Sequence, residues 1–227
     1  MMDHLTRFAA ELFGTFTLCA IAILARAGTT QGDAANIIAA LAYGLGVVAA
    51  MHACGAMGPV HLNPAVTLAI FATGRGSLLR VLACIAGQLV GACLAGLLVM
   101  WLLAGEGTAM GVPVGSFTKS DPVKTVVVEG LLTMVWAAVF LGCVFGGKLG
   151  AAAPLPIGMA VVALTLAGLP FTGAAMNPAR ALASAVASLD VSSLWMYSAG
   201  PLAGAAVAGL VGRVLLADGG STTTRKA

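Results

Sequence analysis

The sequence predicts an all-α membrane protein with six transmembrane helices and two re-entrant half-helices, arranged as an inverted repeat of three plus three spans. Three observations support this fold class. Of the 227 residues, 60% are hydrophobic and only 8% are charged, whereas a typical soluble domain has about 25% charged residues. Six apolar segments are long enough to cross a bilayer, and two shorter ones open with the same tripeptide. The two halves of the chain also resemble each other in four places.

The composition excludes several other classes of protein. A chain of this length cannot hide so much apolar surface from water, so most of that surface must face lipid. The net charge of +3 is too small for a nucleic-acid-binding surface. Arg7 and Glu11 lead directly into a full-length apolar segment, which argues against a cleaved signal peptide. The five cysteines form no Cys-x-x-Cys pair and are interpreted as buried hydrophobic residues, with Cys54 expected to be the most accessible to thiol reagents.

The predicted spans follow from the lengths of the apolar segments. A transmembrane helix needs about 20 predominantly apolar residues. Such segments lie near residues 8–26, 35–55, 79–104, 124–146, 153–170 and 192–216. Two shorter apolar pieces, at residues 64–73 and 178–189, follow the second and fifth segments. At 1.5 Å per residue each of them is about half a membrane thick, which predicts a re-entrant half-helix.

Basic residues predict the orientation in the membrane. With the N-terminus in the cytoplasm, the cytoplasmic segments contain Arg7, Arg75, Arg80, Lys148, Arg213, Arg225 and Lys226. The loops on the other side contain only Arg26, Lys119 and Lys124, set among acidic residues. This excess of Lys and Arg places both termini in the cytoplasm. The tail of residues 218–227, rich in Gly, Ser and Thr, is expected to be disordered.

An internal repeat divides this single transmembrane domain at about residue 118, into residues 1–118 and 119–217. Glu11 corresponds to Glu129, residues 44–49 to 158–163, residues 63–65 to 177–179, and residues 86–97 to 199–210. One such match could be chance in so apolar a chain, but four in the same order are not. Each half holds three spans, so the second half enters the membrane from the opposite side. Inverted repeats place the functional site at the midplane, where broken helices meet.

The two short segments carry the candidate chemistry. They open with Asn63, Pro64 and Ala65 in the first half and with Asn177, Pro178 and Ala179 in the second. Asn is a favoured N-cap, and Pro is tolerated at the first helical position. The repeat brings the two N-termini together, each with about half a positive charge from its helix dipole. We expect cations to be repelled there, while the Asn NH₂ groups donate hydrogen bonds to water or to a hydroxyl group.

Charged residues inside apolar segments are assigned to the same region. Arg180 follows the second tripeptide, and its exposure to lipid would cost at least about 2.5–3.5 kcal/mol. We interpret it as a donor that faces a cavity and repels cations, and not as a surface arginine that reaches the membrane interface. Glu11 and Glu129 are interpreted as acceptors that hold the half-helix loops, with a proton relay as the alternative. His61 is assigned to the vestibule, and neither it nor His52 has a partner at metal-ligand spacing, so no metal or cofactor is expected.

Four motifs resemble the aquaporin, or major intrinsic protein, family. They are Glu11-Leu-Phe-Gly-Thr15, His61-Leu-Asn-Pro-Ala-Val-Thr67, Gly173-Ala-Ala-Met-Asn-Pro-Ala-Arg180 and Ala199-Gly-Pro201. The match covers essentially the whole chain, which is similar to short bacterial members. The resemblance implies a right-handed bundle in a bacterial plasma membrane, assembled in lipid as a homotetramer with one pore in each subunit. It also implies a passive channel, not an enzyme, that conducts water and small uncharged solutes and excludes ions and protons.

The same resemblance implies a selectivity filter built from Tyr43, Thr165, Ala174 and Arg180. Water-selective members usually have His at the position of Thr165. Glycerol-conducting members usually have Gly there and a second aromatic residue at the position of Ala174. Two functions therefore stay open, namely a water channel and a facilitator for glycerol, urea or neutral metalloid hydroxides such as arsenite. An ion-coupled or proton-coupled transporter, a third alternative, would need a coupling acid at the midplane.

Overall fold

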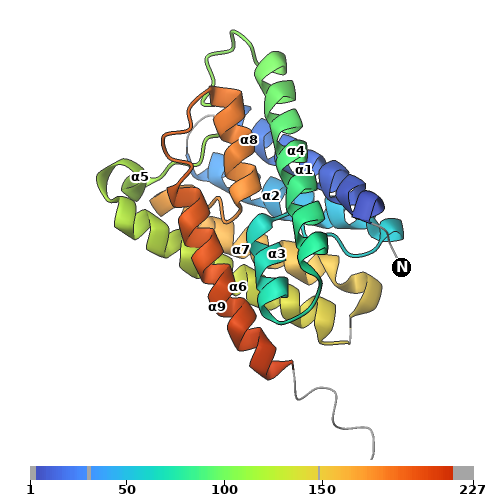
Figure 1. The fold of residues 1–227 in the computed structure, drawn as a ribbon. Coiled ribbons are helices and arrows are strands. Elements are labelled where there is room, and N and C mark those ends of the chain that lie inside the picture. The colour runs from blue at the N-terminus through green and yellow to red at the C-terminus, as the bar shows by residue number, and fades with distance from the viewer. Residues whose placement is uncertain (1–3, 30–31, 148, 217–227) are drawn as a thin grey trace, which may run out of the picture.

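The computed structural model describes residues 4–29, 32–147 and 149–216, and its regular structure there is entirely helical (Figure 1). The six long helices are α1 (His4–Ala27), α2 (Asp33–Ala53), α4 (Leu78–Leu102), α6 (Pro122–Phe145), α7 (Pro154–Thr172) and α9 (Met196–Leu215). All six are long and apolar enough to cross a membrane. The two half-helices are α3 (Pro64–Ala72) and α8 (Pro178–Ser188). The predicted fold class is confirmed, and the chain is an integral, multi-pass membrane protein.

Helix ends depart most from the predicted ones at two starts. α1 begins at His4 instead of residue 8, because helical structure continues past the apolar segment into its polar flank. α9 begins at Met196 instead of residue 192, because the residues before it form turns. The sequence did not predict the short α5 (Ser116–Ser120) or the two 3₁₀ turns, η1 (Gly55–Met57) and η2 (Gly150–Ala152). The predicted disordered tail and the basic residues Lys148, Arg225 and Lys226 lie outside the described residues.

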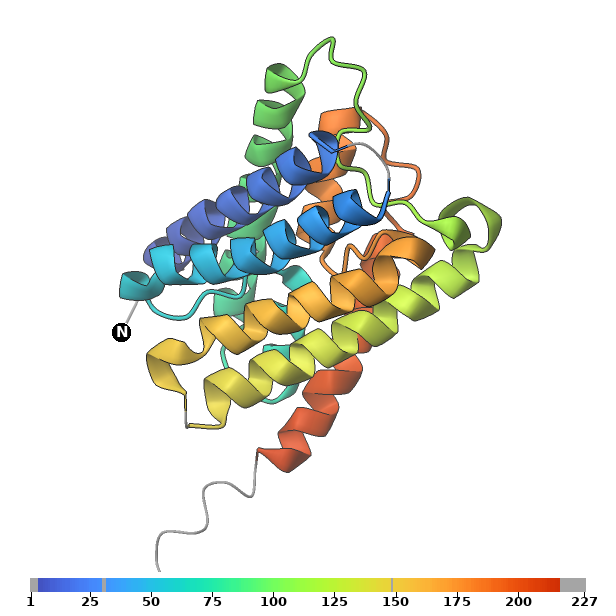
Figure 2. The same cartoon turned by 180° about the vertical axis from the view of Figure 1, so that it is seen from behind.

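The helices of the two halves pack in matching pairs. α1 packs along α4, and α6 packs along α9 in the same way. Figure 2 shows α1, α2, α7 and α6 as successive neighbours across one face of the bundle, with the contact between α2 and α7 joining the halves. Each half-helix lies on the last long helix of the other half, α3 on α9 and α8 on α4. This exchange brings the two half-helices into contact inside the bundle.

Two glycines permit the close crossing of α2 and α7. A Cβ atom on Gly44 would collide with the carbonyl oxygen of Gly158, and a Cβ atom on Gly158 would collide with the carbonyl oxygen of Gly44. Both glycines stand at the start of the matching segments 44–49 and 158–163. Small residues let membrane helices approach closely, and close van der Waals packing largely drives their association. The crossing therefore sets the position of α2 and α7, which carry Tyr43 and Thr165.

We expect Gly44→Ala to lower the thermal stability of the purified protein. The added methyl group must push the two helices apart, and overpacking of this kind costs about 1–3 kcal/mol. Gly142→Ala is the matched control, because a Cβ atom there meets nothing within 4 Å. Thermal unfolding in a mild detergent compares both variants with the original chain. Equal unfolding temperatures for the two variants would contradict the close crossing.

Candidate functional site

The half-helices α3 and α8 are each capped by the Asn residue that precedes them. Oδ1 of Asn63 accepts the backbone N–H of Ala65 at 2.8 Å. Oδ1 of Asn177 accepts the backbone N–H of Ala179 at 2.9 Å. Both Asn residues have extended backbones and are followed by Pro at the first helical position. Each helix start is therefore built locally by the Asn-Pro pair.

The same two side chains tie the half-helices to each other. Nδ2 of Asn63 donates to the carbonyl oxygen of Met176 at 2.9 Å, and Nδ2 of Asn177 donates to the carbonyl oxygen of Leu62 at 2.8 Å. Each side-chain NH₂ group has two N–H donors. One donor of each group is therefore used to join the loops, and one is left for another partner. The sequence reasoning did not foresee this link between the halves.

Leu62 and Met176 occupy equivalent positions directly before the two Asn residues, and both have left-handed backbones. Their φ angles are 59° and 52°. Residues with a Cβ atom seldom adopt this conformation, which costs roughly 1–3 kcal/mol and persists only where the surroundings enforce it. Each of the two residues also offers its carbonyl oxygen to the opposite Asn. The contact between the halves thus depends on strained backbone that other groups must hold.

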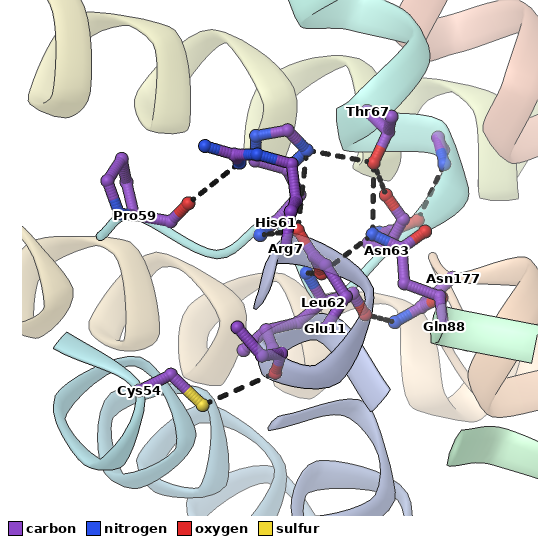
Figure 3. Close-up of polar contacts among 12 residues, drawn as sticks. Arg7, Glu11, Cys54, Pro59, His61, Leu62, Asn63, Thr67, Gln88 and Asn177 are labelled. Carbon is purple, nitrogen blue, oxygen red and sulfur yellow. Dashed lines mark hydrogen bonds and ion pairs between the residues drawn. The ribbon is translucent and has the colours of Figure 1, made fainter. Parts of the chain in front are cut away.

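Glu11 holds the first loop. Its Oε1 accepts the backbone N–H of His61 at 2.7 Å, and its Oε2 accepts that of Leu62 at 2.8 Å. Nε2 of Gln88, on α4, donates to Oε2 at 2.9 Å and also lies 3.0 Å from Oγ1 of Thr67. Figure 3 shows this network, in which the carboxylate from α1 lies against the loop that leads into α3. The side chain is fully buried, so these hydrogen bonds offset the cost of removing its charge from water.

Glu129 holds the second loop in the same manner. It accepts the backbone N–H groups of Ala175 at 3.0 Å and Met176 at 2.6 Å, and the hydroxyl of Thr172 at 2.7 Å. The hydroxyl of Tyr197 lies 2.6 Å from the carbonyl oxygen of Thr172 and fixes the end of α7. Glu129 is also fully buried. The two acids that correspond in the repeat therefore make corresponding contacts.

Arg180 is buried at the start of α8 with donors that have no partner in the described chain. Its guanidinium carbon lies 5.1 Å from the ring centroid of Tyr43. Nε and Nη1 of Arg180 make no hydrogen bond with the described residues, and neither does Oγ1 of Thr165 on α7. The hydroxyl of Tyr43 donates to the carbonyl oxygen of Ala175 at 2.8 Å. Buried polar atoms are normally paired, so the unpaired atoms of each of these two side chains are free to bind a small polar molecule.

Ala174, the remaining filter candidate, is fully buried in the loop before α8 and has a positive φ of 47°. Its backbone N–H donates to Oγ1 of Thr172 at 3.2 Å. Its methyl group is close enough to Gly168 that a Cβ atom there would meet it at 3.2 Å. Gly168 is on α7, as is Thr165, so the loop before α8 packs against the helix that carries the second filter candidate.

Sequence reasoning missed two aromatic residues of α6. The Trp136 ring meets that of Tyr43 edge-on, with centroids 6.0 Å apart, and its Nε1 has no hydrogen-bond partner among the described residues. The ring of Phe140 meets that of His61 edge-on at 6.1 Å. Trp136 lies about two helical turns and Phe140 about three turns after Glu129, and all three are on the buried face of α6. Helical spacing from Glu129 was the signal that would have found them.

One set of side chains in the described chain has the donor atoms and proximity to hold a metal ion. Ligand atoms of Glu11, His61 and Cys84 lie within 4.8 Å of one another. However, both oxygens of Glu11 already accept N–H donors, and Nδ1 of His61 lies 3.0 Å from Oγ1 of Thr67. The prediction for Cys54 is wrong. Its thiol is fully buried and contacts the carbonyl oxygen of Ala10 at 3.4 Å, because the loop that follows α2 folds back against α1.

We expect Glu129→Gln to destabilise the protein. The amide keeps one oxygen, but it loses the charge and turns an NH₂ group toward backbone donors. Hydrogen bonds to a charged group contribute about 1.5–3 kcal/mol each. Glu106→Gln is the control, because Glu106 is exposed in a loop. Thermal unfolding in detergent measures both, and an unfolding temperature for Glu129→Gln equal to that of the control would contradict the bracing role.

Comparison with known proteins places these features in context. Residues 1–212 match the protein family described as Major intrinsic protein. The chain is 33% identical to Aquaporin Z of Rhodopseudomonas palustris, over 92% of each chain. It is 36% identical to the lens fiber major intrinsic protein of Gallus gallus, over 89% of this chain and 78% of the relative. The X-ray structure of the aquaglyceroporin from Plasmodium falciparum shares the fold, with a TM-score of 0.78 and 22% identity over 91% and 94% of the two chains.

Proposed function

Since the chain belongs to the major intrinsic protein family and is therefore a membrane channel for water or small solutes, we propose that it conducts mainly water. Small uncharged solutes pass as a secondary activity. The relatives with the names Aquaporin Z and lens fiber major intrinsic protein support this choice. The observation that carries it is the set of buried, unpaired polar atoms on Arg180 and Thr165, beside the junction of the half-helices.

The proposed path runs from Arg180 past the two Asn side chains to His61. A water molecule at the outer end accepts hydrogen bonds from the guanidinium and forms one with the hydroxyl of Thr165. At the junction, the second N–H of Asn63 and of Asn177 supplies the next donors. Successive donors from the protein replace the hydrogen bonds that each water molecule loses when it leaves bulk water. Passage therefore needs no large change of the fold.

Exclusion of cations follows from the signs of these groups. Two helix N-termini and one guanidinium all present positive charge to the path, where little water is left to screen it. Glu11 and Glu129 each accept three hydrogen bonds, so their carboxylate oxygens are not available to coordinate a passing cation. This commitment of the acids also argues against the proton-coupled transporter.

A facilitator for glycerol, urea or arsenite is the second candidate, and the size of the filter residues favours it. Tyr43, Thr165, Ala174 and Arg180 are the proposed filter. Thr165 and Ala174 are small, so their side of the filter leaves more room than a His or a second aromatic residue would. One solved structure that shares the fold is that of an aquaglyceroporin by its name. Flux measurements with both kinds of permeant decide between the candidates.

We propose that both termini are cytoplasmic and that the protein is a homotetramer in a bacterial plasma membrane. Six crossings leave the start of α1 and the end of α9 on one side. Arg7, Arg75, Arg80 and Arg213 lie on that side, as the distribution of basic residues in membrane proteins favours. Large apolar side chains such as Leu79, Trp101 and Val214 are exposed on the monomer and suit contact with lipid or with other subunits. Chemical cross-linking in native membranes tests the tetramer.

We expect Thr165→His to narrow the proposed filter. The larger ring should leave water permeability within about twofold of the original. Flux of glycerol and urea should fall at least about tenfold, because a steric clash that raises the free-energy barrier to their passage by about 1.4 kcal/mol or more slows it by that factor. Thr165→Val is the control of equal size, and it removes only the hydroxyl. Stopped-flow light scattering on proteoliposomes measures each permeant. Unchanged solute flux in Thr165→His would show that this side chain does not face the path.

We expect Arg180→Ala to admit larger solutes and protons, because the change removes both bulk and positive charge from the path. Arg180→Lys keeps the charge and should retain proton exclusion, although it loses the fixed geometry of the guanidinium. A pH-sensitive dye inside proteoliposomes reports the proton leak, and swelling in glycerol reports solute flux. If Arg180→Ala stays as tight to protons as the original chain, the assignment of charge exclusion to Arg180 is wrong.

A further inference from the structure

A pocket of about 100 Å³ at one end of the bundle is lined by three arginines from different segments. Arg7 is on α1, Arg75 is in the loop between α3 and α4, and Arg80 is on α4. His61 and Thr67 also line the pocket, which therefore lies beside the loop that leads into α3. None of the described residues that line it is acidic. The pocket adjoins the inner end of the proposed path, where His61 stands two residues before Asn63.

The positive charges in this pocket are poorly compensated. The Arg7 guanidinium donates to the carbonyl oxygen of Pro59 at 3.4 Å, and that of Arg75 donates to the carbonyl oxygen of Leu216 at 3.5 Å. The guanidinium of Arg80 makes no hydrogen bond or ion pair with the described residues. Where the structure describes the chain, neither of the ion pairs, His61–Glu11 and Lys124–Asp121, includes an arginine. Three guanidinium groups thus face one small space. The one carboxylate close to it, that of Glu11, already accepts hydrogen bonds from the backbone of His61 and Leu62 and from Gln88.

A metal ion is the obvious alternative occupant, because Glu11, His61 and Cys84 lie close together at this pocket. Three nearby guanidinium groups repel a cation. Figure 3 shows that the carboxylate of Glu11 and the imidazole of His61 are already part of the hydrogen-bond network that holds the loop. Metal binding would have to break that network. An anion meets neither obstacle.

We propose that the pocket binds an oxyanion of the phosphate type and that the bound anion obstructs the path beside His61. Guanidinium groups bind phosphate through paired, charge-assisted hydrogen bonds, and several arginines can share one phosphate. The phosphate can belong to a soluble compound or to a lipid headgroup at the membrane surface. The obstruction rests on the proposed path, whereas the binding does not. The site would let the anion content of one compartment regulate permeation.

Calorimetry on the purified protein in a neutral detergent tests the binding directly. Inorganic phosphate is titrated at constant ionic strength, with chloride as the reference anion, because salt screens such contacts. We expect saturable binding that Arg80→Gln weakens about tenfold or more, equivalent to about 1.4 kcal/mol. Arg213→Gln should leave it unchanged, because Arg213 is exposed on α9 outside the pocket. Absent binding, or equal affinities in the two variants, overturns the site.

Zinc ions in the same assay test the metal alternative. Binding of Zn²⁺ that is tighter than that of phosphate, and that Cys84→Ser abolishes, would replace the anion site by a metal site. Weak Zn²⁺ binding that is insensitive to Cys84→Ser supports the anion. Because the measurement reports binding and not flux, its result does not depend on the proposed permeant.

Proteoliposomes test the obstruction. Vesicles of phosphatidylcholine alone give the basal water permeability, and its absence there would contradict the proposed function without bearing on the pocket. Phosphate on both faces, or phosphatidylglycerol in the bilayer without phosphate, should lower permeability in the original chain and in Arg213→Gln but not in Arg80→Gln. An effect of only one of these additions identifies the source of the anion. Phosphate that binds in calorimetry yet leaves permeability unchanged overturns the obstruction.

Discussion

The reciprocal hydrogen bonds that Asn63 donates to Met176 and Asn177 donates to Leu62 are the constraint on which the rest of the structure depends. Two chain segments that stop and turn within a membrane expose backbone groups where water cannot pair with them. Each Asn caps its own half-helix and donates to the carbonyl oxygen that precedes the other. One side chain thus satisfies groups from both halves. The halves must therefore fold together, because neither loop is fully paired alone.

Glu11 on α1 and Glu129 on α6 satisfy further backbone groups of the same two loops. Each places its carboxylate against the strained loop and accepts two consecutive backbone N–H groups. Their burial would be costly if the charges were unpaired, so the loops stabilise the acids as much as the acids stabilise the loops. α1 and α6 must then lie at a fixed depth beside α3 and α8. The glycine crossing of α2 and α7 closes the bundle around the junction.

The two halves differ at the residue that follows each tripeptide. Arg180 follows the second tripeptide, whereas Val66 occupies the same position after the first. A guanidinium group therefore follows the tripeptide directly on one side of the junction only. The opposite side has His61 and, farther out, the pocket of Arg7, Arg75 and Arg80. A symmetric framework thus holds two unlike ends. We interpret the first as the filter for permeants and the second as a place where the environment acts on the channel.

Local sequence patterns determined the six spans, the two half-helices and the Asn caps, because length, hydropathy and capping are properties of neighbouring residues. Symmetry within the chain directed attention to Glu11 and Glu129 as a pair. Only the tertiary structure decided that each Asn bonds across the junction, that Trp136 touches Tyr43, and that Cys54 is inaccessible. It also decided that Cys84 and three arginines share one pocket with His61. These contacts join residues far apart in the chain, and their geometry depends on how closely the helices approach, which hydropathy does not encode.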